Sequence, residues 1–216
     1  MGTKLEDGQS LLFIGDSITD CGRRDDRGRP LGLGYVRMVH DLLIGREPEK
    51  QIKVINRGIG GNTIEDLRSR WADDVIAYKP DWLSIKIGIN DANRHLCSEN
   101  QNYMPPAEFR DIYIQLLEMT QKAMPGIELL LITPFFISRD QTEGSYRKKV
   151  LEILPEYIKV VEEMSRKFGT RLINLHDIFQ KILDHRLAED LCPEPVHPHS
   201  TGHLVMAEAV YRALCQ

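Results

Sequence analysis

The chain has 216 residues, of which 42% are hydrophobic and 28% are charged, and its formal net charge is −4 at pH 7. This length and apolar content predict one domain, residues 1–216, with a core of its own, and they exclude a disordered chain. The slightly acidic balance lacks the basic surface that binds nucleic acid or an anionic membrane, so we expect neither partner.

Short apolar runs alternate along the chain with longer amphipathic segments, a pattern typical of βα units around a parallel sheet. The first run is apolar throughout, as expected of a strand that is covered on both faces. The apolar runs predict strands at 11–14, 52–55, 82–87, 127–132 and 171–174. The amphipathic segments predict helices at 35–44, 63–78, 108–124, 146–168 and 201–214. We therefore expect an α/β fold, a three-layer α/β/α sandwich with about five parallel strands.

Two of the predicted helices carry a local signal. Thr63 and Asp66 form a capping-box pattern at the start of the second helix, with Asp in place of the usual Glu. The last helix has apolar residues at helical spacing. The residues predicted on one face are Leu204, Ala207, Val210 and Leu214.

Polar and turn-forming residues follow the first three predicted strands and precede the last helix. In an open parallel sheet, ligands bind outside the carboxyl ends of the strands, so these stretches are the expected place for a site. They contain Ser17 after the first strand, Gly61 after the second and Asn90 after the third, and His197 lies before the last helix.

These residue types suit nucleophilic catalysis. Ser17 would open a turn or short helix, whose outward N–H groups can stabilise an oxyanion. Gly61 can bring a bare N–H close to a substrate because it has no Cβ, and Asn90 offers an amide donor. His197 is the base that a serine needs near neutral pH, and Glu194, three residues earlier, can hold the second imidazole nitrogen.

Each of these residues also has a purely structural interpretation. Ser17 is a good helix cap, and Gly58 and Gly60 fit a tight turn. Asn90 can close a turn with its own backbone. Their occurrence together, in separate loops at one edge of the predicted sheet, favours a site over four unrelated loops.

The remaining polar residues near these motifs are assigned supporting roles. We expect Asp16 and Asp91 to tie loops together rather than to touch substrate. His197, His199 and His203 include a His-x-His pair that would suit a metal. No carboxylate or thiol cluster completes such a site in the sequence, so no metal is expected.

Four short motifs in order resemble those of the GDSL/SGNH hydrolases. They are residues 15–17 (Gly-Asp-Ser), 56–63 (Asn-x-Gly-x-x-Gly-x-Thr), 88–91 (Gly-x-Asn-Asp) and 194–198 (Glu-Pro-Val-His-Pro). The resemblance covers nearly the whole chain and implies a flavodoxin-like α/β/α sandwich. The chain departs from the family pattern at two positions. It has Ile18 where the family has leucine, and it has Glu194 where the family has aspartate.

The resemblance implies roles for individual residues. It makes Ser17 the catalytic nucleophile and His197 its base, with Glu194 in the place of the family's aspartate. The oxyanion hole would consist of the Ser17 N–H, the Gly61 N–H and the Asn90 amide. The implied chemistry is two-step acyl transfer through an acyl-enzyme on Ser17, and it requires no cofactor.

The stretch 56–93 is most similar to the carbohydrate acetyl esterases, including the acetylxylan esterases. This similarity implies an acetyl ester on a sugar or xylo-oligosaccharide as substrate. A general short-chain carboxylesterase, thioesterase or lysophospholipase is the alternative enzyme, and a carbohydrate-binding relative without catalysis is the alternative from another class. Six aromatic residues would either stack on a sugar or pack in the core. They are Tyr35, Trp71, Trp82, Tyr103, Phe135 and Phe136, of which Trp82 lies inside a predicted strand.

Other sequence features bear on the cellular setting. Residues 1–10 lack the apolar region of a signal peptide, and no stretch approaches the roughly 18 apolar residues of a membrane span. The four cysteines match no zinc or Cys-x-x-Cys pattern and are interpreted as reduced thiols. We therefore expect a cytoplasmic protein, and the sequence leaves open whether it forms a homo-oligomer.

Overall fold

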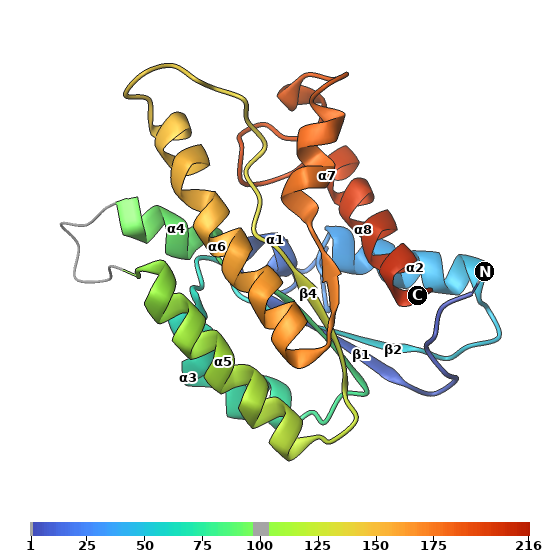
Figure 1. Ribbon diagram of the computed structural model, residues 1–216. Coiled ribbons are helices and arrows are strands. Elements are labelled where there is room, and N and C mark those ends of the chain that lie inside the picture. The colour runs from blue at the N-terminus through green and yellow to red at the C-terminus, as the bar shows by residue number, and fades with distance from the viewer. Residues whose placement is uncertain (1, 97–103) are drawn as a thin grey trace.

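The computed structural model describes residues 2–96 and 104–216, and its five strands form one parallel sheet in the order β2-β1-β3-β4-β5. The strands are β1 Ser10–Gly15, β2 Lys53–Gly58, β3 Trp82–Lys86, β4 Glu128–Ile132 and β5 Arg171–Ile173. Helices cover both faces of the sheet, so the predicted α/β/α sandwich with five parallel strands is confirmed (Figure 1).

The helices form two layers. In one layer α2 packs along α8, and in the other α3 and α6 pack against α5 while α4 packs against α6 (Figure 1). The helices are α1 Ser17–Asp20, α2 Tyr35–Arg46, α3 Ile64–Trp71, α4 Ile89–Leu96, α5 Pro106–Ala123, α6 Tyr146–Phe168, α7 Leu175–Ile182 and α8 Ser200–Leu214. A π-helical segment, Ala72–Ile76, continues α3, and a short 3₁₀ helix spans Ala188–Asp190.

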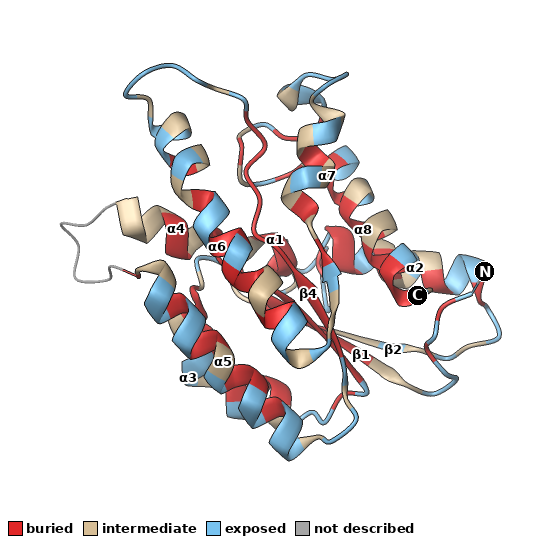
Figure 2. Ribbon diagram, in the orientation of Figure 1, coloured by how far each residue is buried: buried red, intermediate tan, exposed pale blue. Residues whose placement is uncertain are grey.

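The core lies between the sheet and these two layers, where Figure 2 shows the buried residues gathered. All five residues of β3 are buried, and five of the six residues of β1 are. Both strands lie inside the sheet, which explains why their sequences are nearly continuous apolar runs instead of alternating ones.

Several sequence predictions are corrected by the structure. The helix predicted at 63–78 is α-helical only to Trp71, after which the backbone widens into the π segment. The capping box at its start is present, with Thr63 and Asp66 each accepting from the other's backbone N–H. Asn90 does not lie in a loop but in the first turn of α4, and α7 was not predicted.

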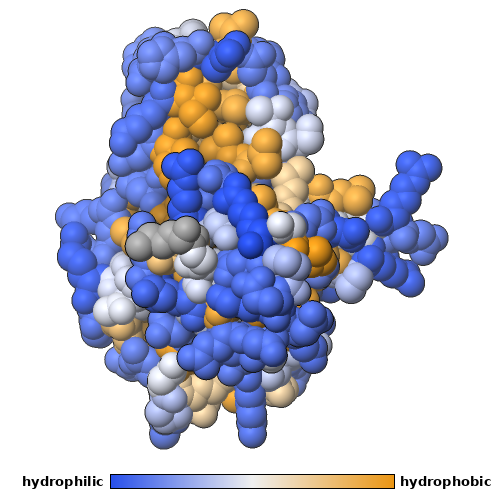
Figure 3. All heavy atoms as spheres, turned by 90° about the vertical axis from the view of Figure 1, so that its right-hand side faces the viewer, coloured by the Kyte–Doolittle hydropathy of each residue, from blue (hydrophilic) through white to orange (hydrophobic). Residues whose placement is uncertain are grey.

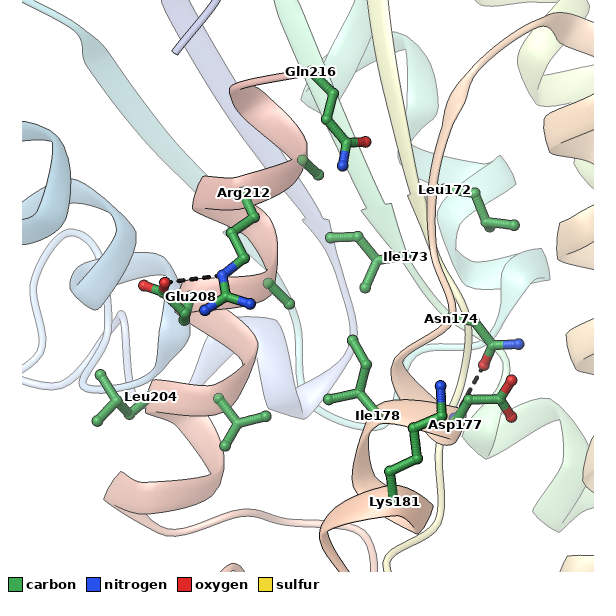
Figure 4. A pocket seen from close by; sticks show the side chains of 13 residues that line it. Leu172, Ile173, Asn174, Asp177, Ile178, Lys181, Leu204, Glu208, Arg212 and Gln216 are labelled. Carbon is green, nitrogen blue, oxygen red and sulfur yellow. Dashed lines mark hydrogen bonds and ion pairs between the residues drawn. The ribbon is translucent and has the colours of Figure 1, made fainter. Parts of the chain in front are cut away.

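The four apolar residues predicted on one face of the last helix differ in burial. Ala207, Val210 and Leu214 are buried, but Leu204 is 54% exposed. Leu204 instead borders a groove of about 620 Å³ between β5, α7 and α8, which Figure 4 shows from close by. Apolar side chains also gather in the upper part of the face drawn in Figure 3.

The order of the strands fixes where a site can form. β1 is hydrogen-bonded to β2 on one side and to β3 on the other, with Gly15 opposite both Gly58 and Lys86. The carboxyl ends of these three strands are therefore neighbours, and the chain reverses its direction of winding there. Within the described ranges, no helix has the length and apolar character that crossing a membrane would need.

Candidate active site

Ser17 is the residue at which the chain leaves β1 and begins α1. The helix is capped by Asp16, whose carboxylate accepts from the Ile18 N–H at 3.0 Å. Ser17 is half-buried, and its Oγ lies 2.8 Å from Nε2 of His197, which is 180 residues further along the chain. This distance is that of a hydrogen bond between a nucleophile and its base.

His197 lies in the loop that precedes α8, and Glu194 of the same loop contacts it. The Glu194 Oε1 atom is within hydrogen-bond distance of His197 Nδ1 and also accepts from the His197 backbone N–H at 2.8 Å. Its other carboxylate oxygen accepts from the Val196 N–H at 3.0 Å. The loop is fixed to the segment after β4 by the bond from the Ile137 N–H to the Pro195 carbonyl, 2.8 Å long.

These contacts determine the charge state of Glu194. Partial burial raises its pKa, but the hydrogen bonds from the Val196 N–H, from the His197 ring and from the His197 backbone N–H lower it by more, so the pKa lies below its ordinary value. Glu194 is therefore ionised near neutral pH and faces Nδ1 of His197. A carboxylate in this position favours the tautomer with Nε2 unprotonated and stabilises the imidazolium that forms when Nε2 takes a proton.

The loop that follows β2 lies beside Ser17. A Cβ on Gly60 would lie 3.9 Å from Ser17 Cβ, which shows how close the loop is. The next residue, Gly61, has φ +78, a left-handed conformation that favours glycine. Within the described part of the chain, the backbone N–H groups of Ser17 and Gly61 have no acceptor. Both N–H groups are therefore available to an oxygen atom of a ligand.

Asn90 is oriented by the same loop. Its Nδ2 atom donates to the Asn62 carbonyl at 2.9 Å, and an amide nitrogen carries two hydrogens, so a second donor is left. Because Asn90 lies in the first turn of α4, its side chain comes from a rigid element instead of a loop.

Asn56 and Gly58, from the motif at residues 56–63, bring α1 and β2 close together. Asn56 is buried, and its Nδ2 atom donates to the carbonyls of Thr19 and Leu31, both at 2.7 Å. A Cβ on Gly58 would lie 2.2 Å from the Asp20 backbone nitrogen. A tight turn was expected to explain the glycines at positions 58 and 60. At position 58 the stronger requirement is the close packing of α1, which leaves no room for a Cβ.

Sequence reasoning missed Lys86, which forms a buried ion pair with Asp16. Both side chains are fully buried, and Lys86 Nζ lies 3.0 Å from one carboxylate oxygen of Asp16 and 3.3 Å from the other. Burial lowers the pKa of Lys86, and the charge of Asp16 opposes that effect. The pair fixes the residue that caps α1, one position before Ser17. The available signal was a lysine in a strand whose other residues, Ser84 excepted, are apolar.

Asp91 has the loop-tying role that the sequence predicted. It is fully buried, and its Oδ1 accepts from the Ile64 N–H at 2.9 Å, at the start of α3. Burial raises the pKa of Asp91 to about 7.

The histidines near the site are used in hydrogen bonds to the backbone. His199 Nδ1 accepts from the Thr201 N–H, and its Nε2 faces the Glu189 carbonyl. His203 is buried in α8, where Nδ1 accepts from the Tyr35 N–H at 3.2 Å. No group of three or more metal-binding side chains occurs in residues 2–96 and 104–216.

The sequence left open whether six aromatic residues stack on a sugar or pack in the core. The five described ones pack in the core. The five that the structure describes are at most 3% exposed, and Tyr103 lies outside the described residues. The five are Tyr35, Trp71, Trp82, Phe135 and Phe136. Trp71 and Trp82 each donate their indole N–H to another side chain, Thr120 and Gln9 respectively.

Comparisons with known proteins extend over nearly the whole chain. A sequence model of the GDSL-like lipase/acylhydrolase family matches residues 13–205. An acetylxylan esterase from Geobacillus stearothermophilus is 37% identical over 221 residues, which cover 98% of this chain and 96% of that protein. The crystal structure of a catalytic mutant of an acetylxylan esterase from that organism has a TM-score of 0.88 at 35% identity, covering 98% of this chain and 96% of that one.

A further structure is similar to the same degree. An alpha/beta hydrolase enzyme from the metagenome of Lake Arreo has a TM-score of 0.87 at 30% identity, covering 99% of this chain and 98% of that one. The described architecture and its length are thus shared with proteins from different sources.

Proposed function

The chain belongs to the GDSL-like lipase/acylhydrolase family, and we propose that it removes acetyl groups from xylo-oligosaccharides with Ser17 as nucleophile. It is a carboxylic ester hydrolase, as its family and its acetylxylan esterase relative indicate. The observation that carries the assignment of residues is the chain of contacts from Ser17 Oγ through His197 to Glu194.

The first half of the reaction transfers the acetyl group to the enzyme. Ser17 Oγ attacks the acetyl carbonyl carbon while His197 Nε2 takes the hydroxyl proton. The carbonyl oxygen becomes an oxyanion, which accepts from the Ser17 N–H, the Gly61 N–H and the second Nδ2–H of Asn90. The tetrahedral intermediate then collapses. The bond to the sugar oxygen breaks, and His197 returns its proton to that oxygen.

The second half of the reaction releases acetate. A water molecule replaces the sugar, gives a proton to His197 and attacks the acetyl carbon, and the proton passes to Ser17 Oγ as the acyl-enzyme breaks. In both halves the transient imidazolium lies against the ionised Glu194. Asp16 acts indirectly, because it caps the helix that Ser17 opens.

We also propose that the enzyme is cytoplasmic. Cys21 and Cys192, which lie in the described ranges, are free thiols, which is typical of a reducing compartment. An enzyme in that compartment meets imported oligosaccharides instead of polymeric xylan, which supports the oligosaccharide as substrate.

A substrate series tests the proposed function. The purified protein is assayed on acetylated xylo-oligosaccharides and on p-nitrophenyl esters of increasing acyl length. We expect kcat/KM for the acetyl ester to exceed that for the octanoyl ester by at least about tenfold, since each added methylene must find room in the acyl site. A preference for octanoyl esters would instead indicate a lipase or lysophospholipase. Failure to hydrolyse any ester, together with no labelling by an organophosphonate, would indicate a carbohydrate-binding relative.

A further inference from the structure

Arg70 reaches from α3 to the carboxyl ends of the strands that carry the site, and the mechanism above makes no use of it. Its side chain is only 14% exposed. It lies one residue before the end of α3, next to the π-helical segment that contains Asp74.

All three nitrogens of the Arg70 guanidinium donate hydrogen bonds. Nε donates to Asn62 Oδ1 at 2.8 Å, and Nη2 donates to the Gly15 carbonyl at 3.2 Å. Nη1 donates to the Arg57 carbonyl at 2.8 Å and to Asp74 Oδ2 at 2.5 Å. One planar group therefore joins the end of β1, the end of β2 and the loop that follows β2.

Two of these contacts, those to Gly15 and Asn62, lie near groups that would hold the oxyanion. Gly15 precedes Ser17 by two residues, and Asn62 follows Gly61 directly. The Asn62 carbonyl also accepts from the Asn90 amide at 2.9 Å. The three donors come from different segments of the chain. Arg70 binds Gly15, two residues before Ser17, and Asn62, which follows Gly61 and accepts from Asn90.

We propose that Arg70 is the positioning residue of the oxyanion hole, fixing the places of its three donors relative to one another. This inference rests on the proposed function. Donors of this kind act in the transition state, and their effect depends on distances that must hold to a few tenths of an ångström. A guanidinium spreads five N–H groups over three nitrogens in fixed directions and can hold three segments at set positions, whereas an ammonium group has its three donors on one freely rotating nitrogen.

We infer that the contribution of Arg70 is geometric, and its charge is partly offset by a neighbouring carboxylate. Asp74 is buried and binds both Arg70 and Arg57. Burial raises the pKa of Asp74, and the bonds from these two guanidinium groups lower it by more, so it is ionised. The positive charge near the site is thus partly neutralised, and the arrangement of the donors is what changes when Arg70 is replaced.

The test compares Arg70→Lys with Arg68→Lys. Arg68 is a matched control on the same helix, since its side chain is 44% exposed and pairs with the Glu65 side chain, which is 43% exposed. We expect Arg70→Lys to lower kcat on an acetyl ester by roughly 10–100-fold with KM within about twofold, because misplaced oxyanion donors affect the transition state. Arg68→Lys should match the parent. Asn62→Ala removes one arm of the network and should lower kcat less than Arg70→Lys does.

Two further readouts separate positioning from a general loss of structure. Affinity for a boronate that forms a tetrahedral adduct on serine should weaken in parallel with kcat/KM. The acid limb of the pH profile should stay in place, because no contact within the described ranges joins Arg70 to His197. Parent-like kcat in folded Arg70→Lys and Asn62→Ala would contradict the inference, as would a kcat loss with unchanged boronate affinity. If Arg70→Lys does not fold, Asn62→Ala decides by the same criteria. An inactive parent protein would contradict the proposed function and this inference with it.

Discussion

The carboxylate of Glu194 is folded back onto its own loop. It accepts from the N–H groups two and three residues ahead as well as from the His197 ring. These bonds show how the longer side chain reaches His197 Nδ1 from a place where the family has aspartate, while His197 Nε2 stays 2.8 Å from Ser17 Oγ.

Glu194→Gln should lower kcat on the order of 10²-fold or more, because the amide keeps the shape but cannot stabilise the imidazolium as a carboxylate does. Glu194→Asp should keep measurable activity. Because the pKa of Glu194 is below its ordinary value, its charge is lost only when the pH falls through that lowered pKa. Steady-state kinetics of both variants from about pH 5 to 9 test this. Parent-like activity of Glu194→Gln would mean that another group orients His197.

His203 makes a prediction about stability. Burial lowers its pKa from 6.5 to about 4, so the folded protein keeps it neutral where the unfolded chain is protonated. Its stabilising contribution is therefore complete above pH 6.5 and is lost as the pH falls toward 4. The loss amounts to up to about 3 kcal/mol.

His203→Asn keeps an acceptor for the Tyr35 N–H but does not titrate. Urea unfolding of parent and variant between about pH 4 and 8 should show the parent losing more stability on the acid side. The comparison is needed because Asp91, with a pKa raised to about 7, has the opposite dependence and loses stabilisation as the pH rises. If stability changed with pH in the same way in the parent and in His203→Asn, the predicted contribution of His203 would be refuted.

At the scale of elements, the packing of α1 on the end of β2 depends on Gly58. A Cβ there would lie 2.2 Å from the Asp20 nitrogen and 2.6 Å from the Thr19 carbonyl carbon, and backbone cannot yield as a side chain can. Gly58→Ala should therefore displace α1, destabilise the protein by more than about 2 kcal/mol and lower activity.

Gly45→Ala is the matched control, since Gly45 lies in α2 and a Cβ at that position would have nothing within 4 Å. It should stabilise the protein by roughly 0.5–1 kcal/mol and leave activity unchanged. Chemical denaturation and an acetyl ester assay measure both variants. Equal stabilities for the two variants would show that the close approach at Gly58 is unimportant.

The elements that could be predicted from the sequence are those with a strong local pattern. All five strands lie on the predicted apolar runs, and α6 begins and ends where its pattern does. The start of α4 was mistaken for a loop because Gly88, Asn90 and Asp91 are turn-forming residues. Leu204 fits the period of the last helix but faces a groove, because α8 lies near the edge of the sheet at β5.

At the scale of the whole molecule, the order of the strands assembles the site. Because β1 lies between β2 and β3, the segments with Ser17, Gly61 and Asn90 are neighbours. This much follows from the rule for ligand sites in parallel sheets. The contacts of Lys86 and Arg70 could not be predicted, since they join segments whose separation in space no local pattern encodes.

The central claim is that Ser17 is the nucleophile, and Ser17→Ala tests it most directly. Asp16, not Ser17, caps α1, so alanine should leave the unfolding midpoint close to that of the parent. We expect kcat on acetylated xylo-oligosaccharides to fall on the order of 10⁴-fold or more in the purified, folded variant. Parent-like turnover by that variant would contradict the account.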